Sequence, residues 1–177
     1  QAQVTRREVG RALIPAVNEA FVAAAFYPEP DNRPLSMQAD LVGTKSLDAA
    51  LDKAKSFAES HPDPNWVLGG GWNQVIWNLD RFPTAKELDT AIPDRPALLS
   101  RVDGHAAWAN SAAIKLAGVN KDTKDPVGGR IERDAEGNPS GVFVDEAIGL
   151  IASKIPKMPD SVRSAALTAS LEQMASL

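Results

Sequence analysis

Two polar residues and a glycine follow an apolar run of the sequence and could carry chemistry. Asp103, Gly104 and His105 come directly after residues 97–102, in the stretch "ALLSRVDGH". An imidazole near neutral pH can shuttle a proton, ligate a metal or hydrogen-bond a substrate, and the neighbouring carboxylate can orient it. The structural alternative is that Asp103 caps the next turn and His105 satisfies a backbone carbonyl. On these residues alone the structural alternative is favoured.

A second acidic pair follows another apolar run, in "GVFVDEA". Asp145 and Glu146 stand where a strand is expected to pass into a helix. A carboxylate at that position can bind a metal or act as a general base. Acids in a first helical turn also stabilise the helix, because their negative charge interacts favourably with its dipole. We favour the dipole interpretation for Glu146 and leave both open for Asp145.

Tryptophans near the expected strand ends allow two interpretations. Trp72 follows the glycines at 69–71, and Trp108 follows the Asp-Gly-His stretch. With Trp77 they could line an apolar pocket, or they could pack the core. The three glycines indicate either a sharp turn or a close approach by another segment. They lack the lysine of a phosphate loop, so nucleotide binding is a weak interpretation.

The elements that must position these residues alternate between helix and strand. The apolar stripe of residues 46–60 predicts a helix capped by Ser46, and Thr84 with Glu87 forms a capping box. Residues 66–73 are predicted to form a short buried strand that runs into a glycine loop. Further predicted elements are a strand at 97–102, helices at 84–91, 110–118, 146–154 and from about 160, and a hairpin at 128–144. This alternation favours an α/β fold, in which sites form at the carboxyl ends of strands.

Composition excludes several classes of protein. The 177 residues are 44% hydrophobic and 24% charged, which is typical of one folded domain. A net charge of −4 gives no support for nucleic-acid binding. No apolar run is long enough to span a bilayer. The absence of cysteine and the spacing of the two histidines leave no standard zinc constellation within the chain.

The motifs together resemble the type-3 amidohydrolases, a family that includes N-substituted formamide deformylases. They occur in the family's order in residues 46–177: "GGGWNQ", "FPTAKELD", "PDRP", "DGHAAWANS" and "GGRIERD". Residues 1–45 match poorly. The resemblance implies a segment of a (β/α)8 TIM barrel with a β-hairpin insertion. It also implies a divalent metal, zinc being the expected ion, and hydrolysis of an amide-type C–N bond in a small-molecule substrate.

The resemblance also suggests which residues serve the site. Asp103, His105 and Asp145 are the candidate catalytic residues. The candidate substrate-binding residues are Trp72, Asn73, Trp108 and Asn110, although Asn110 also suits a helix cap. The family's early His-x-His and its later histidines are absent, so no metal is expected on this chain alone. We therefore expect part of an enzyme that is inactive by itself.

The alternative is a catalytically inactive α/β interaction or scaffold domain. In either case an incomplete barrel would expose sheet edges, which favours self-association. Both ends of the chain look abrupt, which suggests a piece of a longer protein. Location is open: cytoplasmic or, if a signal peptide was removed, periplasmic or secreted.

Overall fold

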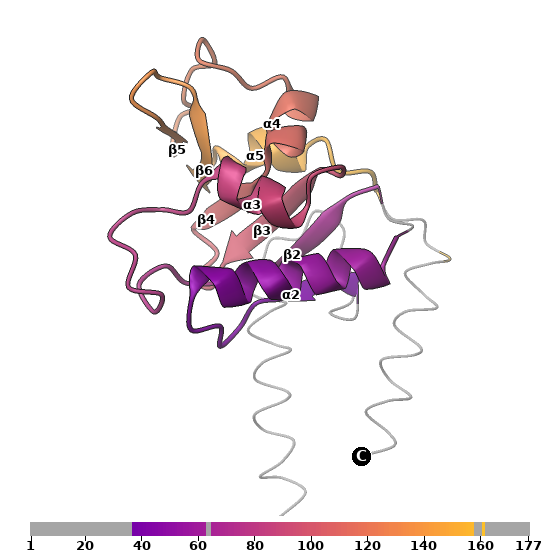
Figure 1. Ribbon diagram of the computed structural model, residues 1–177. Helices are drawn as coiled ribbons and strands as arrows, with labels where there is room; N and C mark the ends of the chain where they lie inside the picture. The colour runs from indigo at the N-terminus through magenta and orange to yellow at the C-terminus, as the bar shows by residue number, and fades with distance from the viewer. Residues whose placement is uncertain (1–36, 63–64, 158–160, 162–177) are drawn as a thin grey trace, which may run out of the picture.

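The computed structural model describes residues 37–62, 65–157 and 161, which form a mixed sheet covered by helices (Figure 1). The strands are β1 (Ala39–Asp40), β2 (Val67–Trp72), β3 (Ala97–Arg101), β4 (Ala106–Ala109), β5 (Gly129–Arg133) and β6 (Pro139–Asp145). The helices are α2 (Leu47–Ser60), α3 (Ala85–Ala91), α4 (Ser111–Ala117) and α5 (Ile148–Ala152). Apart from residue 161, the predicted final helix lies outside the described residues.

The sheet order brings four strand ends to one edge. The order is β1-β2-β3-β4-β6-β5, with β1, β2 and β3 parallel. Strand β4 is antiparallel to both β3 and β6. Strand β6 therefore runs in the same direction as β1, β2 and β3, and the carboxyl ends of all four lie at one edge of the sheet, here called the carboxyl edge.

The α/β prediction is confirmed, and the structure refines it. Among the described residues the sheet has six strands, with β1 and β5 at its two margins. A closed eight-stranded barrel is not seen in this part of the chain. The predicted hairpin is confirmed as β5 and β6, with Gly137 at φ +85° in its turn.

Strand β4 is an addition that the sequence did not reveal. Its four residues, "AAWA", are all buried, so they show no alternation of apolar and polar side chains. They pair with β3 through a tight hairpin whose turn contains Asp103, Gly104 and His105. Asp103, Gly104 and His105, which the sequence suggested lie at the end of a strand, therefore form the turn of a β-hairpin.

The three glycines lie within β2, and the segment that contains β1 and Val42 runs close beside two of them. A Cβ at Gly69 would lie 2.2 Å from the carbonyl oxygen of Ala39. Gly71 has φ +92°, and a Cβ there would lie 2.5 Å from Cγ2 of Val42. Close approach by another segment is thus confirmed at Gly69 and Gly71, and the register of β2 against β3 shifts between Gly70 and Trp72. The predicted short strand is confirmed, but the predicted glycine loop is wrong, because β2 continues through the glycines and ends at Trp72.

The predicted caps are confirmed. Ser46 accepts a hydrogen bond from the backbone N–H of Ala49 at the start of α2. The capping box of α3 is complete, since Thr84 and Glu87 bond each other's backbone. Partial burial alone would raise the pKa of Glu87, but hydrogen bonds from Arg81 and Thr84 outweigh it and hold that pKa below its ordinary value of 4.5.

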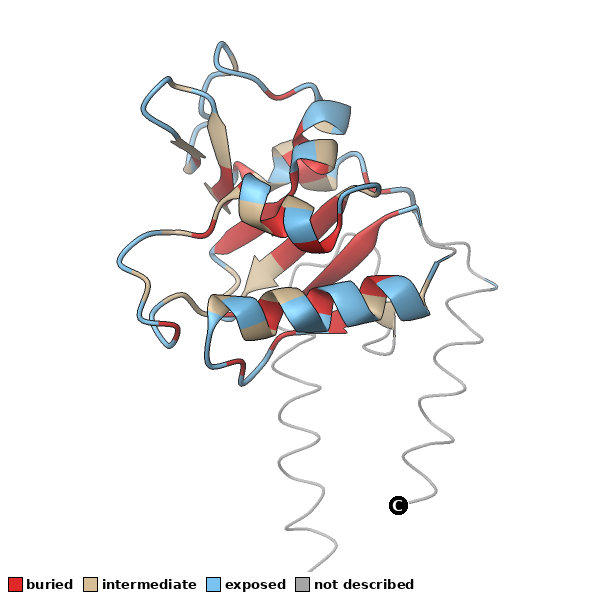
Figure 2. Cartoon of the chain, in the orientation of Figure 1, coloured by how far each residue is buried: buried red, intermediate tan, exposed pale blue. Residues whose placement is uncertain are grey.

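The buried apolar residues form two clusters, one on each face of the sheet. Figure 2 shows buried residues (red) along the strands and on parts of the helices. Helices α2 and most of α3 pack on the first face, and α4 and α5 pack on the second. Burial alternates along β3, where Ala97 and Leu99 face the first cluster and Leu98 the second. The first cluster holds three of the tryptophans. None of the described helices is long and apolar enough to cross a membrane.

Candidate functional site

Five side chains meet at the carboxyl edge and form what we call the edge cluster. Gln74 follows β2, Arg101 ends β3, Asp103 and His105 lie in the β3–β4 turn, and Asp145 ends β6. The sequence-predicted residues Asp103, His105 and Asp145 are therefore brought together. Arg101 and Gln74 were not predicted.

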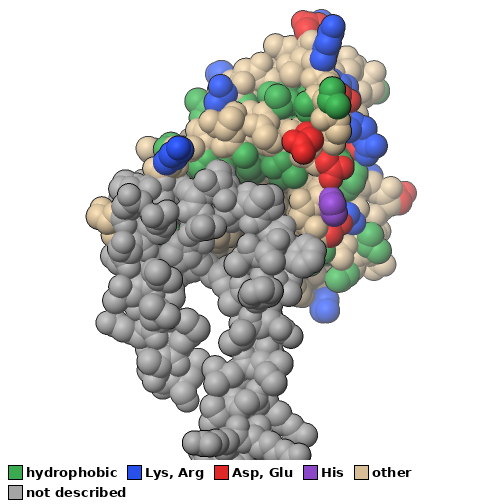
Figure 3. All heavy atoms as spheres, turned by 180° about the vertical axis from the view of Figure 1, so that it is seen from behind, with side chains coloured by type: hydrophobic (Ala, Val, Ile, Leu, Met, Phe, Trp, Pro, Cys, Tyr) green, Lys and Arg blue, Asp and Glu red, His purple; other side chains and the backbone are tan. Residues whose placement is uncertain are grey.

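His105 and Asp145 form a direct pair across two strands. Nδ1 of His105 lies 2.9 Å from Oδ1 of Asp145, and the backbone N–H of Asp145 donates to the carbonyl of His105 at 3.0 Å. Asp145 has φ +50°, an uncommon conformation that aspartate tolerates better than most residues. Both side chains are solvent-accessible, 75% for His105 and 47% for Asp145. The view from behind shows a histidine bordered by acidic side chains on the described surface (Figure 3).

Arg101 and Asp103 form the second pair of the cluster. Nη1 of Arg101 donates to Oδ2 of Asp103 at 2.6 Å, and Nε donates to Oε1 of Gln74 at 3.0 Å. The other carboxylate oxygen of Asp103 accepts the backbone N–H of His105 at 3.1 Å. Both oxygens of Asp103 are therefore engaged within the cluster.

The arrangement suits hydrogen bonding or proton transfer through His105. A carboxylate at Nδ1 favours the tautomer that carries its proton there, which leaves Nε2 as an acceptor. In the part of the chain that the structure describes, Nε2 has no hydrogen-bond partner. No group of three histidine, aspartate or glutamate side chains among the described residues could hold a metal ion. The edge cluster thus does not fit a metal centre.

The tryptophans proposed for substrate binding lie in the interior. Trp72 and Trp108 are fully buried, with ring centroids 6.3 Å apart. The indole N–H of Trp72 donates to the carbonyl of Leu99 at 2.7 Å, and that of Trp108 to the carbonyl of Thr84 at 2.8 Å. Between the two interpretations given for the tryptophans, this placement favours core packing.

Asn110 is also buried, and its amide is fully used by the fold. Oδ1 accepts from the backbone N–H groups of Ala97 and Ala113. Nδ2 donates to the carbonyls of Ile92 and Arg95. The cap interpretation of Asn110 is confirmed, and no hydrogen-bonding position of its amide is left for a ligand.

Asn73 differs from these interior residues, because it is half-buried just beyond the end of β2. Its Oδ1 accepts the backbone N–H of Val75 at 3.1 Å. Substrate contact by Asn73 therefore remains a proposal.

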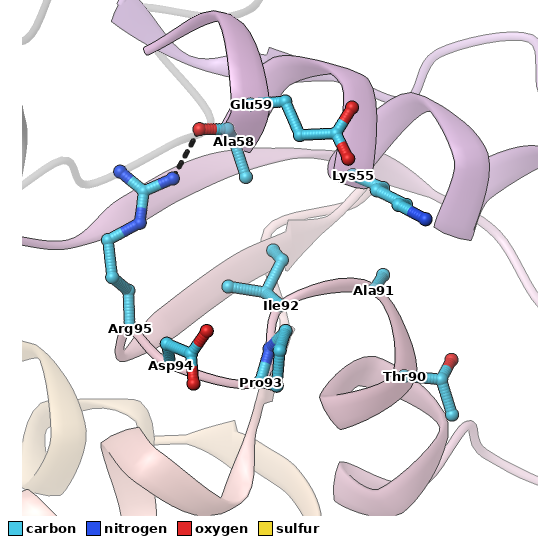
Figure 4. Close-up of a pocket in the computed structure, with 9 residues that line it drawn as sticks. All are labelled: Lys55, Ala58, Glu59, Thr90, Ala91, Ile92, Pro93, Asp94 and Arg95. Carbon is cyan, nitrogen blue, oxygen red and sulfur yellow. Dashed lines mark hydrogen bonds between the residues drawn. The ribbon is translucent and has the colours of Figure 1, made fainter. Parts of the chain in front are cut away.

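Two open pockets lie away from the edge cluster. One, of about 310 Å³, lies between the carboxyl ends of α2 and α3. There the guanidinium of Arg95 reaches back to the carbonyl of Ala58 at the end of α2 (Figure 4). The other, of about 870 Å³, lies between α3, α4 and the β5–β6 hairpin. Neither pocket is lined by a residue of the edge cluster.

Comparison with known proteins defines the class. The model of the amidohydrolase family matches residues 34–177. The chain therefore belongs to the amidohydrolase family, a family of hydrolases.

Two curated relatives and one solved structure illustrate the similarity. YtcJ of Bacillus subtilis (strain 168), a provisionally named amidohydrolase, is 38% identical over 77% of this chain and 26% of its own length. N-substituted formamide deformylase of Arthrobacter pascens is 32% identical over 81% of this chain and 26% of its own. The chain thus spans about a quarter of these relatives. An uncharacterized metal-dependent hydrolase from Pyrococcus horikoshii shares the fold, with a TM-score of 0.50 at 24% identity over 68% of this chain and 22% of that one.

One similarity is of a different kind. FMN-dependent NADH:quinone oxidoreductase 1 of Pseudomonas fluorescens (strain Pf0-1) is 93% identical over 82 residues, which are 46% of this chain and 39% of that protein. The identity is higher than for the hydrolases, but the share of the chain is smaller. The family match, over residues 34–177, includes all of the described residues.

Proposed function

We propose that the chain supplies one wall of the active site of a hydrolase that cleaves an amide-type C–N bond in a small molecule. The observation that carries this proposal is the His105–Asp145 pair, held at the carboxyl edge of a partly parallel sheet. Sites in α/β proteins form at that edge. Membership of the amidohydrolase family and the name of the deformylase relative support the reaction class.

His105 is the residue that we propose to contact the substrate. With Nδ1 fixed by Asp145, its Nε2 can accept a proton or a hydrogen bond from a reacting amide. Asp145 orients the imidazole through the hydrogen bond at Nδ1. We also propose that Asn73, just beyond the end of β2, contacts the substrate at the same edge.

We expect such a hydrolase to use a divalent metal, most simply zinc. We do not assign this ion to the edge cluster, because its residues do not make a metal centre. We propose that its ligands come from other parts of a family-length protein. The 177-residue chain would then be inactive alone. Metal analysis of the purified chain tests this: zinc bound in a one-to-one ratio would contradict the proposal.

The test of function uses family-length proteins, by which we mean proteins as long as the curated relatives that contain these residues as one segment. Three are compared: the wild type, His105→Ala and Asn120→Ala. Amine release is measured from a panel of N-formyl and N-acyl amides. We expect His105→Ala to lower kcat on the order of 10²-fold or more, the usual contribution of a general acid or base. Asn120 is an exposed asparagine outside the cluster, so its variant should keep full activity. Unchanged turnover in a folded His105→Ala protein would contradict the role of His105.

The alternative, an inactive scaffold domain, predicts a different result. No amide would then be hydrolysed by the wild type, whether as the chain or as a family-length protein. The similarity to the FMN-dependent oxidoreductase covers 39% of that protein, so its activity is measured as a further control. We expect no FMN-dependent oxidation of NADH by quinone in the presence of the chain.

A further inference from the structure

We propose that Arg101 is the positioning residue of the edge cluster, acting through Asp103 to fix the turn that carries His105. This inference rests on the proposed role of His105. It changes the role of Asp103 from a catalytic to a positioning residue. It also assigns a role to Arg101, which the sequence motifs did not single out.

The turn is held by Arg101 at two points. The carbonyl of Arg101 accepts the backbone N–H of Gly104 at 2.9 Å, and Gly104 has φ +74°. The side chain of Arg101 holds Oδ2 of Asp103, whose Oδ1 accepts the N–H of His105. Because both oxygens of Asp103 bond inside the turn, the carboxylate fixes the backbone of His105 instead of facing a substrate.

Arg101 is itself held firmly. Its side chain is only 21% exposed, and its guanidinium carbon lies 6.0 Å from the ring centroid of Trp72. Nε donates to Gln74, so the planar group is tied to the end of β2 while Nη1 binds Asp103. A fork with two separate donors needs a guanidinium, and a lysine ammonium cannot reproduce its geometry.

The consequence concerns the imidazole. The backbone of His105 is fixed by Asp103, and its ring is fixed by Asp145 from β6. Loss of the Arg101 side chain removes the hold on Oδ2 of Asp103, while the backbone bond between Gly104 and the Arg101 carbonyl remains. We expect the Asp103 carboxylate to move more freely, which loosens the turn and weakens the hydrogen bond from the His105 ring to Asp145. Misplacement of a reacting group by about 1 Å can cost on the order of 10²-fold in rate.

The test that does not depend on turnover is nitrogen-15 NMR of the histidine rings in the 177-residue chain. The chain has two histidines. His61, whose Nδ1 lies 3.0 Å from the carbonyl of Phe57, serves as the internal reference. We expect wild-type His105 to carry its proton on Nδ1, and Arg101→Ala to give a mixture of tautomers while His61 is unchanged. Arg101→Lys should lie between them.

Arg130→Ala is the matched control. Arg130 also pairs with a carboxylate two residues away, Glu132, but it makes no contact with the turn. It should leave the His105 signals as in the wild type. If Arg101→Ala fails to fold, Gln74→Ala and Asp103→Asn replace it. A wild-type tautomer of His105 in every folded variant of Arg101, Gln74 and Asp103 would overturn the proposal.

Kinetics give the second readout in a family-length protein. Arg101→Ala should lower kcat on the order of 10²-fold, with KM changing much less, and Arg101→Lys should restore part of the rate. A fall in kcat with unchanged histidine spectra would overturn the positioning role. A wild type without activity would contradict the proposed function, while the tautomer measurement would still decide the role of Arg101.

Discussion

Nδ1 of His105 lies 2.9 Å from Oδ1 of Asp145, although 40 residues separate them in the chain. The two residues meet because β4 and β6 are antiparallel neighbours, so the start of one lies beside the end of the other. Replacement of Asp145 by asparagine keeps its shape but weakens its hold on the imidazole. We expect kcat of a family-length Asp145→Asn protein to fall roughly 10-fold to 100-fold, since the general-base contribution it supports is about 10² to 10⁴.

The control for this prediction is Asp134→Asn. Asp134 is an exposed acid of the hairpin turn, where it accepts backbone hydrogen bonds from Glu136 and Asn138. It lies outside the edge cluster. Equal losses of activity in the two variants would argue that Asp145 has no special role.

Asn110→Ala should destabilise the fold strongly. The substitution removes four hydrogen bonds, and it leaves the backbone N–H groups of Ala97 and Ala113 and the carbonyl of Ile92 without these bonds in a buried position. Each unsatisfied buried group costs about 1–3 kcal/mol, so we expect a loss of at least about 3 kcal/mol or failure to fold. Urea denaturation measures it. Asn120→Ala removes only one exposed hydrogen bond, from the backbone N–H of Asp122, so it should cost no more than about 1 kcal/mol.

Gly69→Ala should disrupt the pairing of β1 with β2. The new Cβ would lie 2.2 Å from the carbonyl oxygen of Ala39, a backbone atom that cannot move without shifting the strand. Overpacking of this kind costs about 1–3 kcal/mol. Gly149→Ala is the control, because nothing lies within 4 Å of a Cβ there. In helix α5 that substitution should stabilise the fold by about 0.5–1 kcal/mol. Similar effects of both substitutions on thermal unfolding would contradict the prediction.

The capping box of α3 should make stability depend on pH. Hydrogen bonds from Arg81 and Thr84 lower the pKa of Glu87 in the folded chain, so folding favours its carboxylate. Its contribution is therefore present above about pH 4.5, the ordinary value, and is lost as the pH falls through the folded-state pKa. The difference in unfolding free energy between wild type and Glu87→Gln should shrink below that pH. A difference that grows on acidification would show that the sign is wrong.

Local features could be predicted from the sequence because their causes are local. Ser46, Thr84 and Asn110 were recognised as helix caps, since a cap needs only a side-chain oxygen and the next helical turn. The hairpin of β5 and β6 was recognised from its turn residues. Motif order indicated the amidohydrolase family, which the family match confirms.

Only the tertiary structure decided how these elements meet. Strand β4 is short and buried on both faces, so no alternation of polarity marked it. Its pairing turned Asp103–His105 into a hairpin turn and placed Asp145 beside His105. The roles of Arg101, Gln74 and Asp103 depend on contacts between the ends of neighbouring strands. Sequence fixes which side chains are available, but the register of the sheet determines which of them lie within hydrogen-bonding distance.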